Sequence, residues 1–203
     1  MSNFLEIKNL DKAEKMLRDI PQGFERAVTR AINTSLSKVK TEIKKKVSKE
    51  YNIKSKDLNK DLTVKKATFS KLTGTISARY PREPIIRFLA SAVEAKPKVR
   101  IRKNAKMKIL SGKPNYVGAP FMAFLENGHI GIFQKKSRER KKVTKGKNEG
   151  KRHLPIAQLY TISIAEMIGS ETVSEYVMQE GQKYVENVLE KEVNKILLGY
   201  WKW

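Results

Sequence analysis

The chain has 203 residues, enough for one ordinary domain with its own hydrophobic core. Its 43 lysine and arginine residues against 21 acidic residues give a formal net charge of +22, which attracts polyanions or acidic protein surfaces. The sequence contains no cysteine, so disulfides and thiolate metal sites are excluded. No apolar run approaches the roughly 18 residues that span a bilayer, and the first residues are too polar for a signal peptide. We therefore expect synthesis in the cytoplasm and no contact with a membrane.

The positive charge is concentrated in the first three quarters of the chain. Residues 1–152 contain 39 basic and 14 acidic residues, a net charge of +25, whereas residues 153–203 contain 4 and 7, a net charge of −3. A basic body and a mildly acidic C-terminal part can attract each other within one copy or between copies.

The clearest predicted element is a long helix over residues 24–51. Apolar side chains recur three and four positions apart from Phe24 to Tyr51, which is the stripe of an amphipathic helix, and lysines cover its other faces. A shorter helix over residues 10–18 is expected before it, within an N-terminal extension of residues 1–22.

Strand patterns follow this helix. Residues 62–68 and 71–80 are rich in threonine, valine and isoleucine with rough alternation, and residues 99–101 and 107–110 suggest two shorter strands. Two apolar runs over residues 119–126 and 129–134 are joined across Asn127-Gly128, and Asn-Gly is the strongest short signal for a hairpin.

Residues 135–152 break the pattern, with ten basic and two acidic residues in eighteen positions and almost no apolar side chain. We expect this segment to be an exposed, flexible basic loop. Beyond it, apolar residues recur at helical spacing from residue 171 to about residue 198, which predicts a long C-terminal helix within residues 170–203.

This order of elements predicts an α+β fold. We expect one domain over residues 1–203, in which two long helices pack on one face of an antiparallel sheet drawn from residues 62–134.

The sequence lacks the usual residues of an enzyme. His129 and His153 are the only histidines, and no histidine spacing of a zinc site, nucleophile elbow or phosphate-binding loop is present. The acidic residues between 62 and 152 are scattered, unlike those of a two-metal nuclease, which is the least favoured alternative. We therefore expect a binding or structural protein, with no catalytic residue, metal or cofactor.

The basic loop is the candidate contact surface, either for DNA through salt-dependent phosphate contacts or for an acidic protein partner. Its basic residues are Lys135, Lys136, Arg138, Arg140, Lys141, Lys142, Lys145, Lys147, Lys151 and Arg152. Sequence-nonspecific nucleic-acid binding is therefore the alternative to a purely structural function.

Several segments, taken in order, resemble the minor tail protein Z family of long-tailed bacteriophages and prophages. One segment is similar to the family's Gly-His-x-Gly-Val-Phe hairpin, here Gly128, His129, Gly131 and Phe133, and it is the ordered set of segments that is specific. The remaining segments are Ala31-Ile32-Asn33, Lys40-Thr41-Glu42, the run from Tyr51-Asn52-Ile53-Lys54 to Leu58, Phe121-Met122-Ala123-Phe124, the run from Leu154-Pro155-Ile156 to Tyr160, and the run from Ser163-Ile164 to Met167.

The resemblance implies a structural protein of the virion at the head-proximal end of the tail. It implies tail completion and head–tail joining by a cyclic homo-oligomer, expected to be a hexamer, in contact with neighbouring tail and connector proteins. Contact with phage DNA is a further possible interaction of the basic loop.

Overall fold

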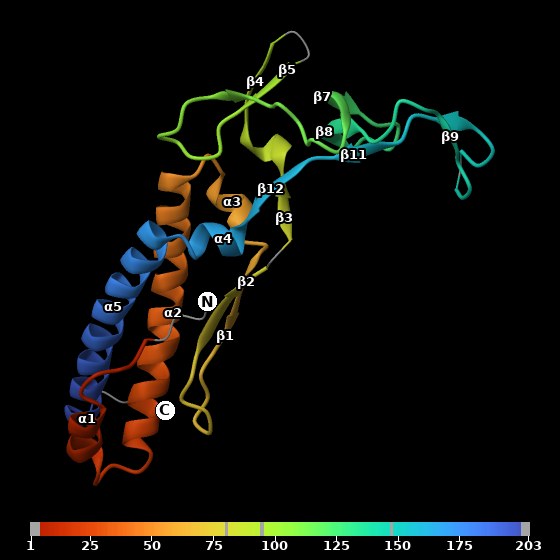
Figure 1. Cartoon of the computed structure of the whole chain (residues 1–203). Helices are drawn as coiled ribbons and strands as arrows, with labels where there is room; N and C mark the ends of the chain where they lie inside the picture. Colours follow the sequence, from red (N-terminus) through yellow and green to blue (C-terminus); the bar gives the residue numbers. More distant parts are fainter. Residues whose placement is uncertain (1–4, 80, 94–95, 147, 200–203) are drawn as a thin grey trace. The chain divides into compact units, whose positions relative to one another are not determined.

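The computed structural model describes residues 5–79, 81–93, 96–146 and 148–199 (Figure 1). The chain divides into two compact units. Unit 1 consists of the described residues of 1–49, 54–80 and 164–203, and unit 2 of those of 50–53 and 81–163. Both helices and antiparallel strands are present, so the predicted α+β class is confirmed. The prediction that the whole chain folds as a single domain stays a prediction.

Unit 1 is mainly helical. Its elements are α1 (Leu10–Leu17), α2 (Gly23–Glu50, whose last residue is assigned to unit 2), α3 (Ser55–Leu58), α4 (Ile164–Ile168), α5 (Glu171–Leu197) and the antiparallel hairpin of β1 (Leu62–Lys65) and β2 (Thr75–Ala78). The helices α2 and α5 occupy the two segments with helical periodicity and have 28 and 27 residues. Gly199, with a φ of 69°, follows the end of α5 and donates its N–H to the carbonyl oxygen of Ile196, as a left-handed C-terminal cap does.

The core of unit 1 lies where α1, α2 and α5 meet. Small side chains of α2, such as Ala27 and Ala31, are fully buried there, and Leu189 and Val193 of α5 pack in the same cluster. Ala13 and Leu17 of α1 complete the cluster, so the segment expected as an N-terminal extension supplies core side chains. Burial of this apolar area holds the helices together, because each isolated helix would be marginal in water.

Asn33 of α2 links the helix to the β1–β2 hairpin. Its amide accepts a hydrogen bond from the N–H of Ala67 at 2.8 Å and donates one to the carbonyl oxygen of the same residue at 3.1 Å. Ala67 itself is buried in the helical core. The asparagine in the segment Ala31-Ile32-Asn33 therefore fixes the hairpin against α2 by pairing both backbone groups of one residue.

A second polar contact joins α2 to α5. Glu42 is largely buried, and its carboxylate accepts hydrogen bonds from Lys45 Nζ at 2.9 Å and from the hydroxyl of Tyr176 at 2.9 Å. Arg30 of α2 lies 3.7 Å from Glu192 of α5. The later residue of α2 contacts the earlier residue of α5, and the earlier residue of α2 contacts the later one of α5. The two helices therefore run antiparallel (Figure 1).

Glu42 should make the stability of unit 1 depend on pH. The hydrogen bond from Lys45 lowers the pKa of Glu42 below its ordinary value of 4.5, burial opposes this, and the hydrogen bond from Tyr176 adds to the lowering. A lowered folded-state pKa contributes stability that is present above the unfolded value and is lost as the pH falls through the folded value. We expect Glu42→Gln to lower the thermal unfolding midpoint at neutral pH. The difference in midpoint between the variant and the wild type should become smaller as the pH falls.

Thermal unfolding followed by circular dichroism from neutral pH down to about pH 3 measures this difference. Glu190→Gln, a change at an exposed position of α5, is the matched control and should follow the wild type throughout. If the difference in unfolding midpoint between Glu42→Gln and the wild type stayed constant with pH, the predicted contribution of Glu42 to pH-dependent stability would be wrong.

Unit 2 contains most of the strands. They are β3 (Arg82–Pro84), β4 (Leu89–Val93), β5 (Lys96–Val99), β6 (Lys108–Ile109), β7 (Val117–Phe124), β8 (Ile130–Lys135), β9 (Lys141–Lys142), β10 (Arg152–His153), β11 (Ile156–Gln158) and β12 (Tyr160–Ser163), with a 3-10 turn, η1 (Ile85–Phe88), after β3.

These strands do not form the single sheet predicted from residues 62–134. Within the described ranges the strands pair into five small antiparallel sheets: β1-β2, β9-β10, β11-β8-β7, β12-β3 and β4-β5-β6. Two physical reasons oppose one continuous sheet. Pro84 is the last residue of β3 and Pro97 stands inside β5, and neither has the N–H that a ladder needs. Register shifts also interrupt the β4–β5 and β7–β8 pairings.

The core of unit 2 positions strand β8. Ile132 of β8 is fully buried and packs with Ile85, Val99 and Leu159. Leu159 donates its N–H to the carbonyl oxygen of Ile132 at 2.8 Å and accepts the N–H of Ile85 at 3.0 Å. The centre of β8 is therefore held by both backbone and side chain, which leaves the end of the β7–β8 hairpin to project beyond the core.

Candidate functional site: the hairpin and the basic arm

The β7–β8 hairpin forms at the predicted place, and its turn is not the one most often found for Asn-Gly. Phe124 pairs with Ile130, and the N–H of Gly128 donates to the carbonyl oxygen of Leu125 at 2.9 Å. Gly128 has a φ of 78°, whereas Asn127 does not have a positive φ, so the two-residue turn typical of Asn-Gly is excluded. The connection is a three-residue loop with glycine in the left-handed position, and the side chain of Asn127 accepts the N–H of His129 at 3.0 Å.

The Gly-His-x-Gly-x-Phe pattern has a structural explanation. The Phe133 ring is buried, with its centroid 6.2 Å from that of His129 and 6.5 Å from that of Phe121. A Cβ on Gly131 would lie only 2.9 Å from two atoms of the Phe133 ring, so this position needs glycine. His129 Nε2 lies 3.1 Å from Gln158 Oε1 of β11, which ties the hairpin end to the neighbouring strand. Three of the four predicted hairpin residues, His129, Gly131 and Phe133, thus pack together, whereas Gly128 lies in the exposed turn with open space beside it.

Gln134, at the end of β8, was not singled out by the sequence analysis. It is almost fully buried, its Oε1 accepts the N–H of Lys113 at 2.8 Å, and its Nε2 donates to the carbonyl oxygen of Gly118 at 2.8 Å. These bonds hold the loop that precedes β7 against β8. The sequence signal that could have identified it was a glutamine side chain at the end of an apolar strand. Such a side chain is buried with the strand and must then form hydrogen bonds.

The basic loop of residues 135–152, called the basic arm below, has backbone structure of its own. Within it β9 pairs with β10, with Lys142 opposite Arg152. The N–H of Val143 donates to the carbonyl oxygen of Lys151 at 2.9 Å, and that of Gly150 donates to the carbonyl oxygen of Val143 at 3.0 Å. The arm is therefore a hairpin, drawn in teal where it carries β9 in Figure 1. Its flexibility stays a prediction.

The cations of the basic arm point to solvent. Nine of the ten predicted contact residues are described and all nine are exposed, while Lys147 lies outside the described residues. None of these nine side chains forms an ion pair with a carboxylate in the described part of the chain. The arm therefore presents a dense positive charge that its own unit leaves uncompensated.

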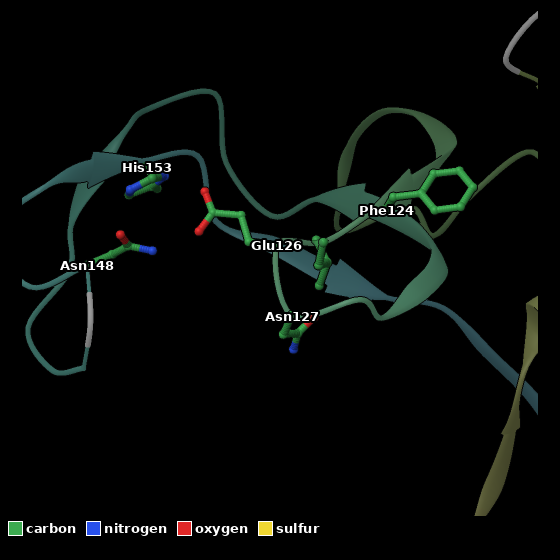
Figure 2. A pocket seen from close by; sticks show the side chains of 6 residues that line it. Phe124, Glu126, Asn127, Asn148 and His153 are labelled. Carbon is green, nitrogen blue, oxygen red and sulfur yellow. The ribbon is translucent and has the colours of Figure 1, made fainter.

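A shallow cleft lies between the arm, with residues from both its turn and its base, and the end of the β7–β8 hairpin. It has a volume of about 520 Å³ and is lined by Phe124, Leu125, Glu126, Asn127, Asn148 and His153. Figure 2 shows the carboxylate of Glu126 on the side of His153 and Asn148, and the ring of Phe124 directed away from them. Phe124 is 70% exposed, so the hairpin end carries an uncovered apolar side chain beside the basic arm.

The described residues contain no group of three or more histidine, cysteine, aspartate or glutamate side chains that could hold a metal ion. Along the same stretches, no helix is long and apolar enough to cross a membrane. The features that do stand out are an uncompensated basic hairpin and an exposed apolar hairpin end on a small α+β framework. Both are features of the kind through which proteins contact other macromolecules.

Comparison with known families identifies the kind of protein. The chain belongs to the family described as prophage minor tail protein Z (GPZ), whose model matches residues 7–198. The resemblance noted in the sequence is thereby confirmed over nearly the whole chain. No curated protein and no solved structure matches the chain. Membership of a phage tail family means a structural protein of the virion that interacts with other tail components.

Proposed function

We propose that this chain is a ring-forming subunit at the head-proximal end of the phage tail, where it completes the tail and makes it competent to join the head. The observation that carries the proposal is membership of the minor tail protein Z family across residues 7–198, a range that covers most of both compact units. In this proposal the subunits form a cyclic homo-oligomer, a hexamer, that also contacts neighbouring tail and head–tail connector proteins.

The distribution of charge supports a ring. A cyclic assembly joins unlike patches of identical subunits head to tail. Residues 1–152 carry a net charge of +25 and offer the positive surface, and α5 exposes Glu171, Glu175 and Glu190 on a helix that is acidic overall. Patches of opposite sign on one chain favour contacts between unlike surfaces over contacts between like ones.

The proposal predicts the result of deleting the gene. We expect heads and tails both to be made but not to join productively, with infectivity reduced by several orders of magnitude. Electron microscopy of lysates and an in vitro joining assay with purified heads and tails measure this, and the intact gene supplied in trans is the control. Normal infectious virions from the deletion strain would contradict the proposal.

Sequence-nonspecific nucleic-acid binding is the second candidate function, favoured by the uncompensated cations of the basic arm. If it were the main function and unrelated to the tail, deletion would impair DNA replication or packaging while tails still completed and joined. Measurement of phage DNA synthesis in the same deletion strain separates the two candidates.

A further inference from the structure

The chemistry of the basic arm differs from that of an ordinary protein interface. Among its described residues there is no aromatic side chain, and its one larger apolar residue, Val143, is partly buried. The centres of protein–protein interfaces are enriched in aromatic side chains and depleted in lysine, whereas interfaces with DNA are polar and strongly positive. The composition of the arm therefore favours a nucleic acid over an acidic protein surface.

The geometry of the arm adds a second argument. Successive residues of a strand point to opposite faces, so Lys141 and Lys142 of β9 lie on opposite faces of the ribbon. Lys142 faces the same side as Arg152, its cross-strand partner. A ribbon that carries cations on both faces is matched by a groove with phosphates on both walls, and the major groove of DNA admits a two-stranded β-ribbon. A flat acidic protein surface would use only one of the two faces.

We propose that the basic arm grips the phosphate backbone of double-stranded DNA without reading its sequence. Single-stranded nucleic acid is the poorer match, because its binding sites stack bases on aromatic side chains, which the described arm lacks. The proposal rests on the proposed function in one respect, since it takes the DNA that passes the head–tail junction as the duplex that the arm meets.

Two variants with equal changes in charge distinguish two causes of DNA binding. One is direct contact between the basic arm and DNA, and the other is attraction of DNA by the net charge of +22 on the whole chain. The arm variant carries Lys141→Gln, Lys142→Gln, Lys145→Gln and Arg152→Gln. The control variant carries Lys12→Gln, Lys15→Gln, Lys38→Gln and Lys49→Gln, all at exposed positions of unit 1. All eight side chains point to solvent, so both variants should fold, and circular dichroism checks this.

Affinity for a short, random-sequence DNA duplex is measured by fluorescence anisotropy with the full-length proteins over a series of salt concentrations. We expect the arm variant to bind about tenfold more weakly or worse, and the control variant to stay close to wild type. The slope of log affinity against log salt should become shallower in the arm variant, by roughly 0.9 for each phosphate contact removed.

Equal losses in the two variants would overturn the proposal, because they would show attraction by net charge alone. Unchanged duplex affinity of the arm variant would also overturn it. If that variant then failed to assemble on tails, the arm would instead dock on an acidic protein surface such as exposed α5 of a second copy. Duplex binding is measured on the purified chain and head–tail joining on phage, so each proposal can fail while the other holds.

Discussion

Replacement of Gln134 by leucine is expected to lower the free energy of unfolding by about 1–3 kcal/mol. Leucine fills a similar volume on β8 but can neither accept the N–H of Lys113 nor donate to the carbonyl oxygen of Gly118. The loop between these two residues would lose its attachment to the strand. Chemical denaturation gives the change in stability, and amide hydrogen exchange at Lys113 should show faster exchange in the variant.

Gln179→Leu, at an exposed position of α5, is the matched control and should change stability by about 0.5 kcal/mol or less. Gln134→Glu tests the two hydrogen bonds separately, since a carboxylate can still accept from Lys113 but cannot donate to Gly118. The prediction would be wrong if Gln134→Leu changed the free energy of unfolding no more than the control does and left hydrogen exchange at Lys113 unchanged. Water would then be replacing both hydrogen bonds without loss of stability.

Gly131→Ala is expected to destabilise the chain by about 1–3 kcal/mol, although alanine normally suits a strand better than glycine does. The added Cβ would lie 2.9 Å from two atoms of the buried Phe133 ring. Either the ring or the strand must shift, and the ring contact with His129 would be disturbed. Denaturation measures the change in stability.

The Phe133→Leu background supplies the control for this prediction, because leucine lacks the ring atoms that the new Cβ would meet. In a double-mutant cycle, Gly131→Ala should cost clearly less in that background than in the wild type. Equal costs in both backgrounds would show that overpacking against Phe133 is not the reason for glycine at this position.

Local sequence patterns predicted two kinds of element. They are the strands whose partner is close in the sequence and the helices whose periodic apolar pattern extends over many residues. The stripe that begins at Phe24 corresponds to α2, and the Asn127-Gly128 step lies in the β7–β8 turn. The form of the turn was not predicted, since it depends on Asn127, which accepts the N–H of His129 from a conformation without positive φ. Periodicity reports which face of a segment is buried but carries no information about what covers it.

Non-local pairings could not be predicted for this reason. Strand β12 pairs with β3, far earlier in the sequence, and Gln134 bonds a loop about twenty residues before it. In the candidate site, the density of cations over residues 135–152 was visible in the sequence, whereas the pairing of Lys142 with Arg152 was not. A pair of two-residue strands leaves no alternation long enough to detect.

The path of the chain through the two units bears on how this protein tolerates change. The chain leaves unit 1 briefly at residues 50–53 and again at residues 81–163, and this second, longer stretch forms an insertion within a helical host. Inserted segments can accept changes of length and composition while the host keeps its own core, provided the points where the chain passes between the units are preserved. A change in the segment that carries the hairpin and the arm would therefore alter the exposed surface of unit 2 while the core formed by α1, α2 and α5 stays intact.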